Sequence, residues 1–409
     1  MTTKINNEHK KLNAPNLRFP EFLGEWSVTT LQKDCIVNPT NEKIADKFVY
    51  VDLESVKQGQ LYKYQILTKD NAPSRAQRVL HTDDILFQCV RPYQMNNYMV
   101  KGTMSDIQWV ASTGYAQIRT QTDYPAFLYC VLNTSKYNKA VMVRCTGSSY
   151  PAINSEDLSK IPFYKCGIAE QKKIADFLSL LDERIATQNK IIDKLQSLIK
   201  GLEDNLLDNP LWKKTYLRSF MQFFSTNSLS WEQLSYEEGE IRNLHYGLIH
   251  GFQTRGINSA SLPMIKNEAV PKQYISCQVG DVAFADASED TGEIAKSVEF
   301  VDTIEGNTIC GLHTIHGRDI KNRTVVGFKG FAFNSRYFHN QIKRLAQGTK
   351  VFSITANNLS SCYVYLPDLE TQKAIVKLLK AYEAQLIVSR KTLKQYEKQK
   401  QYLLRQMFI

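Results

Sequence analysis

The sequence predicts an α+β protein: two mixed α/β domains in tandem repeat, separated by two long helices that form an antiparallel coiled coil with pseudo-twofold symmetry. Three observations predict this fold. The chain has 409 residues, more than one compact core usually holds. Its second half resembles its first, and each half ends in a long heptad pattern. With 43% hydrophobic and 22% charged residues, the chain can bury packed cores.

The bulk properties narrow the class of protein. A net charge of +10, from 51 Lys and Arg against 41 Asp and Glu, suits a protein that neutralises phosphates, although many basic proteins bind no nucleic acid. The polar start contains no signal-like apolar core, and no stretch approaches the roughly 18 apolar residues of a membrane span. We therefore expect a cytoplasmic protein with no membrane partner, whose eight scattered cysteines are free thiols.

The internal repeat organises the chain. Asp84, Ile85 and Phe87 match residues 197 positions later, and Gly114 and Ile118 match Gly311 and Ile315 at the same offset. The offset becomes 200 at Ser135-Lys136-Tyr137 and stays at 201 from Gly147 onward, so one small insertion is expected to explain the drift. In each copy a stretch rich in β-branched and aromatic residues precedes a long helix. The expected divisions are an N-terminal segment at 1–24, a first domain at 25–165, a central spacer helix at 166–209, a second domain at 210–365 and a C-terminal spacer helix at 366–409.

The two helices carry matching apolar seams. From Ile174 to Leu206, apolar residues alternate at spacings of four and three, and residues 375–407 repeat the pattern at an offset of 201. Each stripe could simply pack on its own domain, but the strict period of 3.5 favours a helix pair. Gln188 and Ser389 are polar members at equivalent mid-seam positions, where antiparallel pairing would let a buried polar contact fix the register.

A helix of about 37 residues is about 55 Å long, so a strut of two such helices would present its domains to a duplex about one to one-and-a-half turns apart. Because the two domains differ in sequence, the expected target is asymmetric and split by an unread spacer.

Several segments resemble the specificity subunits of type I restriction–modification enzymes. Residues 145–158 (CTGSSYPAINSEDL) and 346–359 (AQGTKVFSITANNL) are similar to the motif that closes each target recognition domain in that family. Residues 169–175 and 369–375 resemble the starts of its spacer helices, and residues 16–22 resemble its usual opening. The segments 90–93 (VRPY) and 286–292 (DASEDTG) resemble parts of its recognition domains, so the likeness spans nearly the whole chain.

The resemblance implies a division of labour. Each target recognition domain would read one half of a bipartite double-stranded DNA target, and the helices would bind two modification (methyltransferase) subunits, joined by two restriction subunits. The modification subunits would use S-adenosylmethionine to methylate adenine, and the restriction subunits would use ATP and Mg²⁺ to translocate and cut. This chain would direct methylation or restriction without being an enzyme itself, and no cofactor is expected in it.

The sequence gives no sign of catalysis. It contains no G-x-G cofactor turn and no ATP-binding P-loop, and Asn209-Pro210-Leu211-Trp212 lacks the second proline of a methyltransferase motif. Cys310, His313 and His316 have metal-like spacing, but without a fourth ligand we expect ordinary packing and no metal site. The acidic cluster at 286–293 is expected to be a solvated or loop-ordering turn.

Side chains that read bases or hold phosphates predict the DNA contacts. In the first domain these are Arg91, Tyr93, Arg144, Ser148 and Ser149. In the second they are Arg255, Arg318, Lys321, Arg323, Arg344, Thr349 and Lys350. The alternative for each charged residue is a solvated surface charge. The alternative for the chain is a stand-alone sequence-specific DNA-binding protein without enzyme partners.

Overall fold

The computed structural model describes residues 13–40, 42–57, 59–102, 107–252, 255–302 and 307–409. The chain divides into two compact units, and both long helices contribute to each of them. Unit 1 takes the residues up to Thr187 together with Leu393–Ile409, and unit 2 takes Gln188–Thr392.

Unit 1 contains two four-stranded sheets. The first has the strand order β2 (Cys35–Val37), β11 (Tyr115–Thr120), β8 (Ile85–Gln88) and β9 (Tyr98–Met99). The second has the order β6 (Gln65–Thr68), β3 (Lys47–Val51), β10 (Gln108–Ser112) and β7 (Ala76–Leu80). Two small pairs complete the strands: β1 (Ser27–Thr30) with β12 (Pro162–Lys165), and β4 (Val56–Lys57) with β5 (Gln60–Leu61). The short helices are α1 (Leu31–Asp34), α2 (Pro125–Leu132), α3 (Ser135–Met142) and α4 (Ser155–Ser159).

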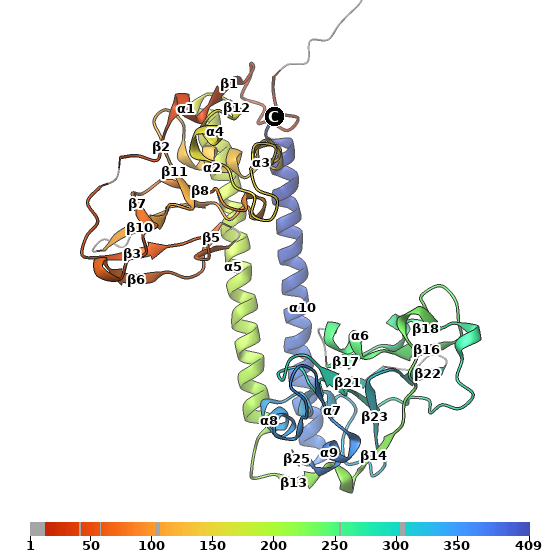
Figure 1. Ribbon diagram of the computed structural model, residues 1–409. Helices are drawn as coiled ribbons and strands as arrows, with labels where there is room; N and C mark the ends of the chain where they lie inside the picture. Colours follow the sequence, from red (N-terminus) through yellow and green to blue (C-terminus); the bar gives the residue numbers. More distant parts are fainter. Residues whose placement is uncertain (1–12, 41, 58, 103–106, 253–254, 303–306) are drawn as a thin grey trace, which may run out of the picture. The chain divides into compact units, whose positions relative to one another are not determined.

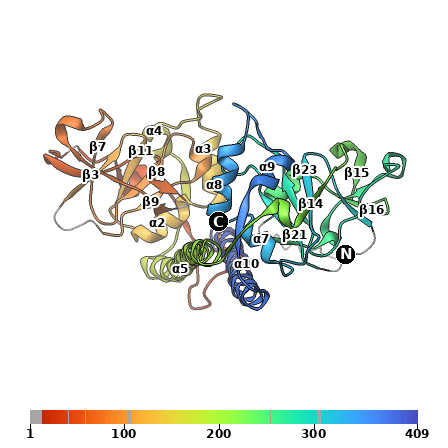
Figure 2. The same cartoon turned by 90° about the horizontal axis from the view of Figure 1, so that it is seen from below.

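These elements form layers next to the long helix α5 (Ile168–Leu207). One core lies between the helices and the β2–β11–β8–β9 sheet, where Phe87 and Ile118 meet Phe127 of α2 and Leu178 of α5. A second core, with Val49, Leu80 and Tyr115 among its members, lies between the two sheets. Figure 1 shows β8 and β11 on the α5 side of this unit, and Figure 2 shows α2 between β9 and α5.

Unit 2 repeats this plan with a larger first sheet. Its strand order is β14 (Met221–Phe224), β23 (Thr314–Asp319), β19 (Val282–Ala285), β21 (Ser297–Phe300) and β17 (Gly256–Ile257). The second sheet has the order β15 (Leu234–Ser235), β18 (Met264–Ile265), β16 (Ile241–Leu244) and β22 (Asn307–Cys310). The small pairs are β13 (Lys213–Tyr216) with β25 (Tyr363–Leu366), and β20 (Ala287–Ser288) with β24 (Phe352–Ser353). The helices are α6 (Tyr246–Gly251), α7 (Phe328–Ala332), α8 (Arg336–Leu345), α9 (Ala356–Ser361) and the long α10 (Leu369–Gln406), with cores again on both faces of the first sheet.

Equivalent hydrogen bonds in the two units correct the predicted alignment of the repeat. Cys89 N donates to Gly114 O, and Asp286 N donates to His313 O, so the offset is 197 at Cys89 but already 199 at Gly114. Tyr124 N donates to Gln171 Oε1, and Val325 N donates to Gln372 Oε1, so the offset there is 201. The pairings of Gly114 with Gly311, of Ile118 with Ile315 and of Ser135 with Ser335 were therefore wrong. Between Cys89 and Tyr124, two insertions of two residues, not one, separate the copies.

The spacer helices predicted within 166–209 and 366–409 are α5 and α10, and they pair in an antiparallel sense within each unit. In unit 1, Leu403 and Met407 near the end of α10 share a core with Ile174 and Leu178 near the start of α5. In unit 2, Leu207 at the end of α5 shares a core with Ile375 and Leu379 at the start of α10. The alternative in which each helix packs only on its own domain was therefore wrong.

The first described residues contact the C-terminal part of α10 in unit 1. Leu17 N donates to Gln406 O at 2.9 Å, and the ring of Phe408 packs against Trp26 and Phe127. Arg18 holds the start of α5 through a two-fold contact with Glu170, at 2.7 and 2.8 Å. In unit 2 the chain runs on without a break from the end of α5 into the second domain. Trp212, just after that helix end, packs against the core.

Candidate nucleic-acid interface

In unit 1 the loop after β8 is held against a hairpin at residues 146–152. Val90 bridges Ala152, Arg91 N donates to Pro151 O at 2.7 Å, and Ile153 N donates to Cys89 O at 3.0 Å. Arg91 itself has a left-handed backbone (φ 54°), which a non-glycine residue rarely adopts. The backbone contacts hold this conformation, and they place the Arg91 guanidinium 4.4 Å from the ring centre of Tyr150.

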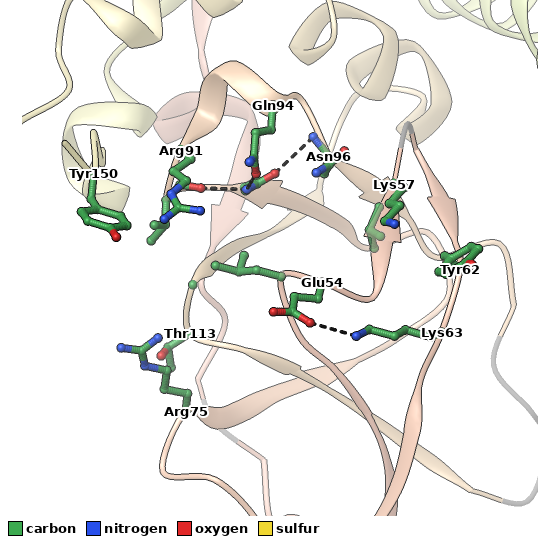
Figure 3. A pocket seen from close by; sticks show the side chains of 15 residues that line it. Glu54, Lys57, Tyr62, Lys63, Arg75, Arg91, Gln94, Asn96, Thr113 and Tyr150 are labelled. Atoms are coloured by element: carbon green, nitrogen blue, oxygen red, sulfur yellow. Dashed lines mark hydrogen bonds and ion pairs between the residues drawn. The ribbon is translucent and has the colours of Figure 1, made fainter. Parts of the chain in front are cut away.

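Arg91 and Tyr150 line a hollow of about 880 Å³, which we call the basic hollow. Its charged lining residues are Glu54, Lys57, Lys63, Arg75 and Arg91. The one acidic group among the described lining residues, Glu54, is paired with Lys63 at 2.8 Å. Figure 3 shows Arg91, Arg75 and Tyr150 toward one side of the hollow, with Lys57, Tyr62 and Lys63 toward the other. The lining therefore has a net positive charge, as a phosphate-facing surface requires.

Carboxamides stand beside these cations. Gln88 Nε2 donates to Gln94 Oε1 and to Val90 O, both at 2.8 Å, and Gln88 Oε1 accepts from Asn96 N. Arginine and carboxamide groups are the side chains that read purine edges in pairs of hydrogen bonds. The arrangement can thus hold a phosphate backbone and present base-reading groups from one ordered loop.

The structure brings most of the predicted first-domain contacts to this region. Tyr93 lies on the same short turn as Pro92 and Gln94 and is 52% exposed. Ser148 and Ser149 are exposed in the hairpin that carries Tyr150, after Gly147 with its φ of 88°. Arg144 is exposed at the end of α3, where its Nη1 donates to Ala140 O.

Sequence reasoning missed several residues of the basic hollow: Lys57, Lys63, Arg75, Gln94, Asn96 and Tyr150. Gln94 and Tyr150 are near predicted contacts in sequence, so their neighbourhood was a usable signal. Lys57 and Arg75 come from other strands and loops, and only the folded sheets bring them to Arg91.

Unit 2 builds the same framework with different side chains. Its Ala287–Ser353 pair corresponds to Val90–Ala152, which puts Ser288 at the position of Arg91. His313 takes the position of Gly114, with its Nδ1 3.1 Å from Asp286 Oδ1 and its ring 5.3 Å from that of Tyr246. The two units therefore present different chemistry at equivalent places.

The predicted second-domain contacts are dispersed over unit 2. Thr349 and Lys350 are exposed in the hairpin at 347–353, and Arg344 is exposed at the end of α8. Lys321 and Arg323 are exposed after β23. Arg323 also lines a hollow of about 570 Å³ together with Lys213, Lys214 and Arg218.

Two predicted contacts, Arg318 and Arg255, are engaged inside unit 2. Arg318 donates twice to Asp281, at 2.7 and 2.8 Å, and once to Ser276 O. Arg255 lies between carboxylates of the two long helices: its Nε is 3.9 Å from Glu203 Oε1, and its backbone N donates to Glu383. Burial raises the pKa of Glu383 to about 7, although the charge of Arg255 opposes the shift. Both arginines thus have structural partners, and their contact with DNA stays a prediction.

The structure separates the three residues with metal-like spacing. His313 is exposed and faces Asp286, whereas Cys310 and His316 are buried. Cys277 is the residue that joins them, with its Sγ 3.6 Å from Cys310 Sγ.

Comparisons with known proteins agree with this fold. Residues 36–197 and 261–398 match the family model described as the type I restriction modification DNA specificity domain. The putative type I restriction enzyme MjaX specificity subunit of Methanocaldococcus jannaschii is 24% identical, with 97% of this chain and 96% of that protein covered. The MjaVIII specificity subunit of the same organism is 24% identical over 63% of this chain and 64% of its own length.

Two solved structures share the fold. The S subunit of a type I restriction–modification system from M. genitalium has a TM-score of 0.58 at 15% identity, covering 97% of this chain and 99% of its own. A chain from a type I R-M system, solved to describe complex assembly and conformational transition, has a TM-score of 0.55 at 18% identity, covering 93% and 96%.

Two mixed sheet domains in tandem, each followed by a long helix and each overlapping a match to the DNA specificity domain, put the chain in the DNA-specificity class of proteins. The chain belongs to the family of type I restriction–modification DNA specificity subunits, which are non-catalytic. Among the described residues, no helix is long and apolar enough to cross a membrane.

Proposed function

We propose that this chain selects the DNA sequence on which a type I restriction–modification complex acts, with each unit reading one half of an asymmetric, bipartite target. The observation that carries the proposal is the difference between equivalent places of the two units. Arg91 and Gly114 in unit 1 correspond to Ser288 and His313 in unit 2, in segments with the same backbone hydrogen-bond pattern. One scaffold with two sets of base-reading groups suits two unlike half-sites.

The long helices supply the proposed docking surface for two modification subunits. Exposed apolar residues recur on them at the repeat offset of 201: Ile168 and Leu369 are 55% and 45% exposed, and Phe177 and Leu378 are 41% and 40% exposed. Large apolar side chains repeated at the same exposed positions favour two copies of one partner. That partner would supply S-adenosylmethionine chemistry, and restriction subunits would add the ATP- and Mg²⁺-dependent steps.

Methylation-sensitive sequencing of DNA from cells that express this chain with a cognate modification subunit tests the proposal. The expected result is a new methyladenine motif with two unlike halves and a fixed spacer, absent from cells that lack this chain. Unchanged methylation despite a purified complex would instead favour a DNA-binding protein that acts without enzyme partners.

Arg91→Ala then tests the basic hollow as the reading site of unit 1. Loss of a paired hydrogen bond to a base costs about 1–3 kcal/mol of discrimination, so the variant should relax one position in one half of the motif and leave the other half intact. Lys160→Ala is the control, because Lys160 is exposed at the C-terminal end of α4 and pairs with Glu156 of the same helix. Equal weakening of both halves by Arg91→Ala would contradict the assignment.

A further inference from the structure

The core between the two sheets of unit 2 contains three side chains that bind soft metal ions. One ligand atom from each of Cys277, Cys310 and His316 lies within 4.8 Å of the other two, and all three residues are buried. The two sulfurs are 3.6 Å apart. Zinc bonded tetrahedrally to two thiolates at 2.3 Å would place them about 3.8 Å apart, so the pair already has the spacing of a shared ion.

The strands explain why these residues meet. Cys277 N donates to Thr308 O beside the bridge between Ser276 and Ile309, so Cys277 lies opposite Thr308. Cys310 is two residues further along β22 and thus on the same face of the strand. His316 comes from β23 in the neighbouring sheet, where it pairs with Ala283, a member of the same core as the two cysteines.

Two further groups complete the surroundings of an ion. The Thr308 hydroxyl is buried on the face of β22 that carries Cys310 and has no hydrogen-bond partner among the described residues, which leaves an unpartnered oxygen opposite Cys277. Asp281 Oδ2 is 2.7 Å from His316 Nε2, and Arg318 and Gln278 N hold that carboxylate in turn. A carboxylate that fixes the histidine ring is a common feature around protein-bound zinc.

Unit 1 shows that the fold does not require these residues. By the hydrogen-bond equivalences, Leu80, Ala111 and Gln117 occupy the positions of Cys277, Cys310 and His316. Leu80 and Ala111 are buried in the corresponding core, and Gln117 donates to Asp84 as His316 contacts Asp281. The three potential ligands are therefore specific to unit 2, and the shared fold does not require them.

We propose that Cys277, Cys310 and His316 form a structural Zn²⁺ site in the inter-sheet core of unit 2. Two thiolates neutralise the divalent charge, and a Cys/His donor set suits zinc among the common divalent cations. The ion would tie β22 and the segment before β19 to β23, which also carries Arg318.

The test measures zinc in the full-length chain, purified without chelators, by elemental mass spectrometry. About one zinc per chain is expected for the natural sequence, and less than about a tenth for a triple variant with Cys277→Leu, Cys310→Ala and His316→Gln. The triple variant introduces the residues that unit 1 packs at these positions, so it should fold, as circular dichroism would verify. His313→Gln is the control and should keep the zinc, because His313 is exposed and faces Asp286.

Cobalt provides a second readout. Co²⁺ added to the metal-free natural chain should give thiolate-to-cobalt charge-transfer absorption, which the triple variant should lack. A chelator should lower the melting temperature of the natural chain and leave that of the triple variant unchanged. A natural chain that holds no more zinc than the triple variant, with no cobalt absorption, would overturn the proposal and leave two thiols that share a hydrogen bond. Loss of zinc in His313→Gln would also overturn it.

Discussion

At the scale of single residues, a buried aspartate has the same task in both units. Asp84 accepts from His81 N, Gln117 and Arg119, and Asp281 makes the corresponding contacts with Gln278 N, His316 and Arg318. Each aspartate thus ties the start of one strand to the end of its neighbour. The strand partners of each aspartate are 33 to 37 positions away from it in sequence, which is why Arg318 was predicted as a DNA contact and not as a partner of Asp281.

Asp281→Asn should lower the free energy of unfolding by about 3 kcal/mol, because it leaves Arg318 without its buried counter-charge. Burial alone would raise the pKa of Asp281, but the bonds from Arg318 and His316 outweigh it and hold the pKa below its usual value. The carboxylate therefore stabilises the fold above about pH 4, and the stabilisation is lost as the pH falls further. Urea unfolding at pH 7 and at low pH measures both effects.

The gap between Asp281→Asn and the natural chain should shrink in acid. Glu156→Gln is the control: its partner Lys160 is exposed, and no measurable change in unfolding is expected. A gap that stays constant down to pH 2 would show that packing, and not the charge of Asp281, stabilises unit 2.

The pKa of Glu383 is shifted in the opposite direction from that of Asp281. Burial raises its pKa to about 7, Arg255 and Lys380 oppose the shift, and Glu203 adds to it. The ionised form is therefore disfavoured in the folded state, and stability falls as the pH rises from about 4.5 through 7. Glu383→Gln should stabilise unit 2 at pH 8 by up to about 3 kcal/mol and have little effect at pH 4.

Chemical unfolding of Glu383→Gln at the two pH values checks this expectation. Glu370→Gln, on the exposed first turn of α10, is the control that should show no such dependence on pH. Destabilisation by Glu383→Gln at pH 8 would mean that the hydrogen bond from Arg255 N outweighs the cost of burying the charge.

At the scale of elements, the long helices are the part of the fold that sequence predicts best, because their seam depends on a local period. Gln188 and Ser389 meet as the period requires: Gln188 Nε2 donates to the backbone O of Ser389 at 3.2 Å. The acceptor is a backbone oxygen, so Gln188 carries the contact and the Ser389 hydroxyl is not needed for it.

Gln188→Leu should therefore raise the melting temperature while loosening the register of α5 against α10, since buried polar seam residues fix register at a cost in stability. Zero-length cross-linking of Asp182 to Lys400, whose charged atoms are 2.5 Å apart in unit 1, reports the register. Its yield should fall several-fold in Gln188→Leu and stay unchanged in Ser389→Ala. Equal yields in all three proteins would remove the register role of Gln188.

The strands were harder to align from sequence, because matching letters do not reveal which residues are hydrogen-bonded partners. Ile118 and Ile315 match as letters, yet Ile118 pairs with Ile85 and the equivalent partner of Val282 is Gly317. The candidate interface has the same difficulty. Arg91 was predictable from its loop, but Lys57 and Arg75 reach it only through sheet pairing between distant segments.

At the scale of the whole molecule, the two copies share their backbone pattern, but only some of their surface side chains are alike. The backbone pattern around Cys89 and Asp286 is shared, whereas the side chains at Arg91 and Ser288 are not. The exposed apolar residues at the helix starts, by contrast, are alike in both copies. A surface that differs between copies suits two different DNA half-sites, and a surface that is the same suits two copies of one protein partner.

The number of modification subunits bound per chain tests whether the repeated apolar residues form two equivalent docking sites. Phe177→Lys or Leu378→Lys alone should leave one modification subunit bound per chain, and the double variant should leave none, because a buried lysine at an apolar contact is costly. Native mass spectrometry of the purified complex counts the subunits. Val388→Lys is the control: Val388 is 61% exposed, but its repeat equivalent is Thr187, so it does not belong to the duplicated apolar set. If each single variant lost both subunits, or neither did, two equivalent docking sites on the helices would be ruled out.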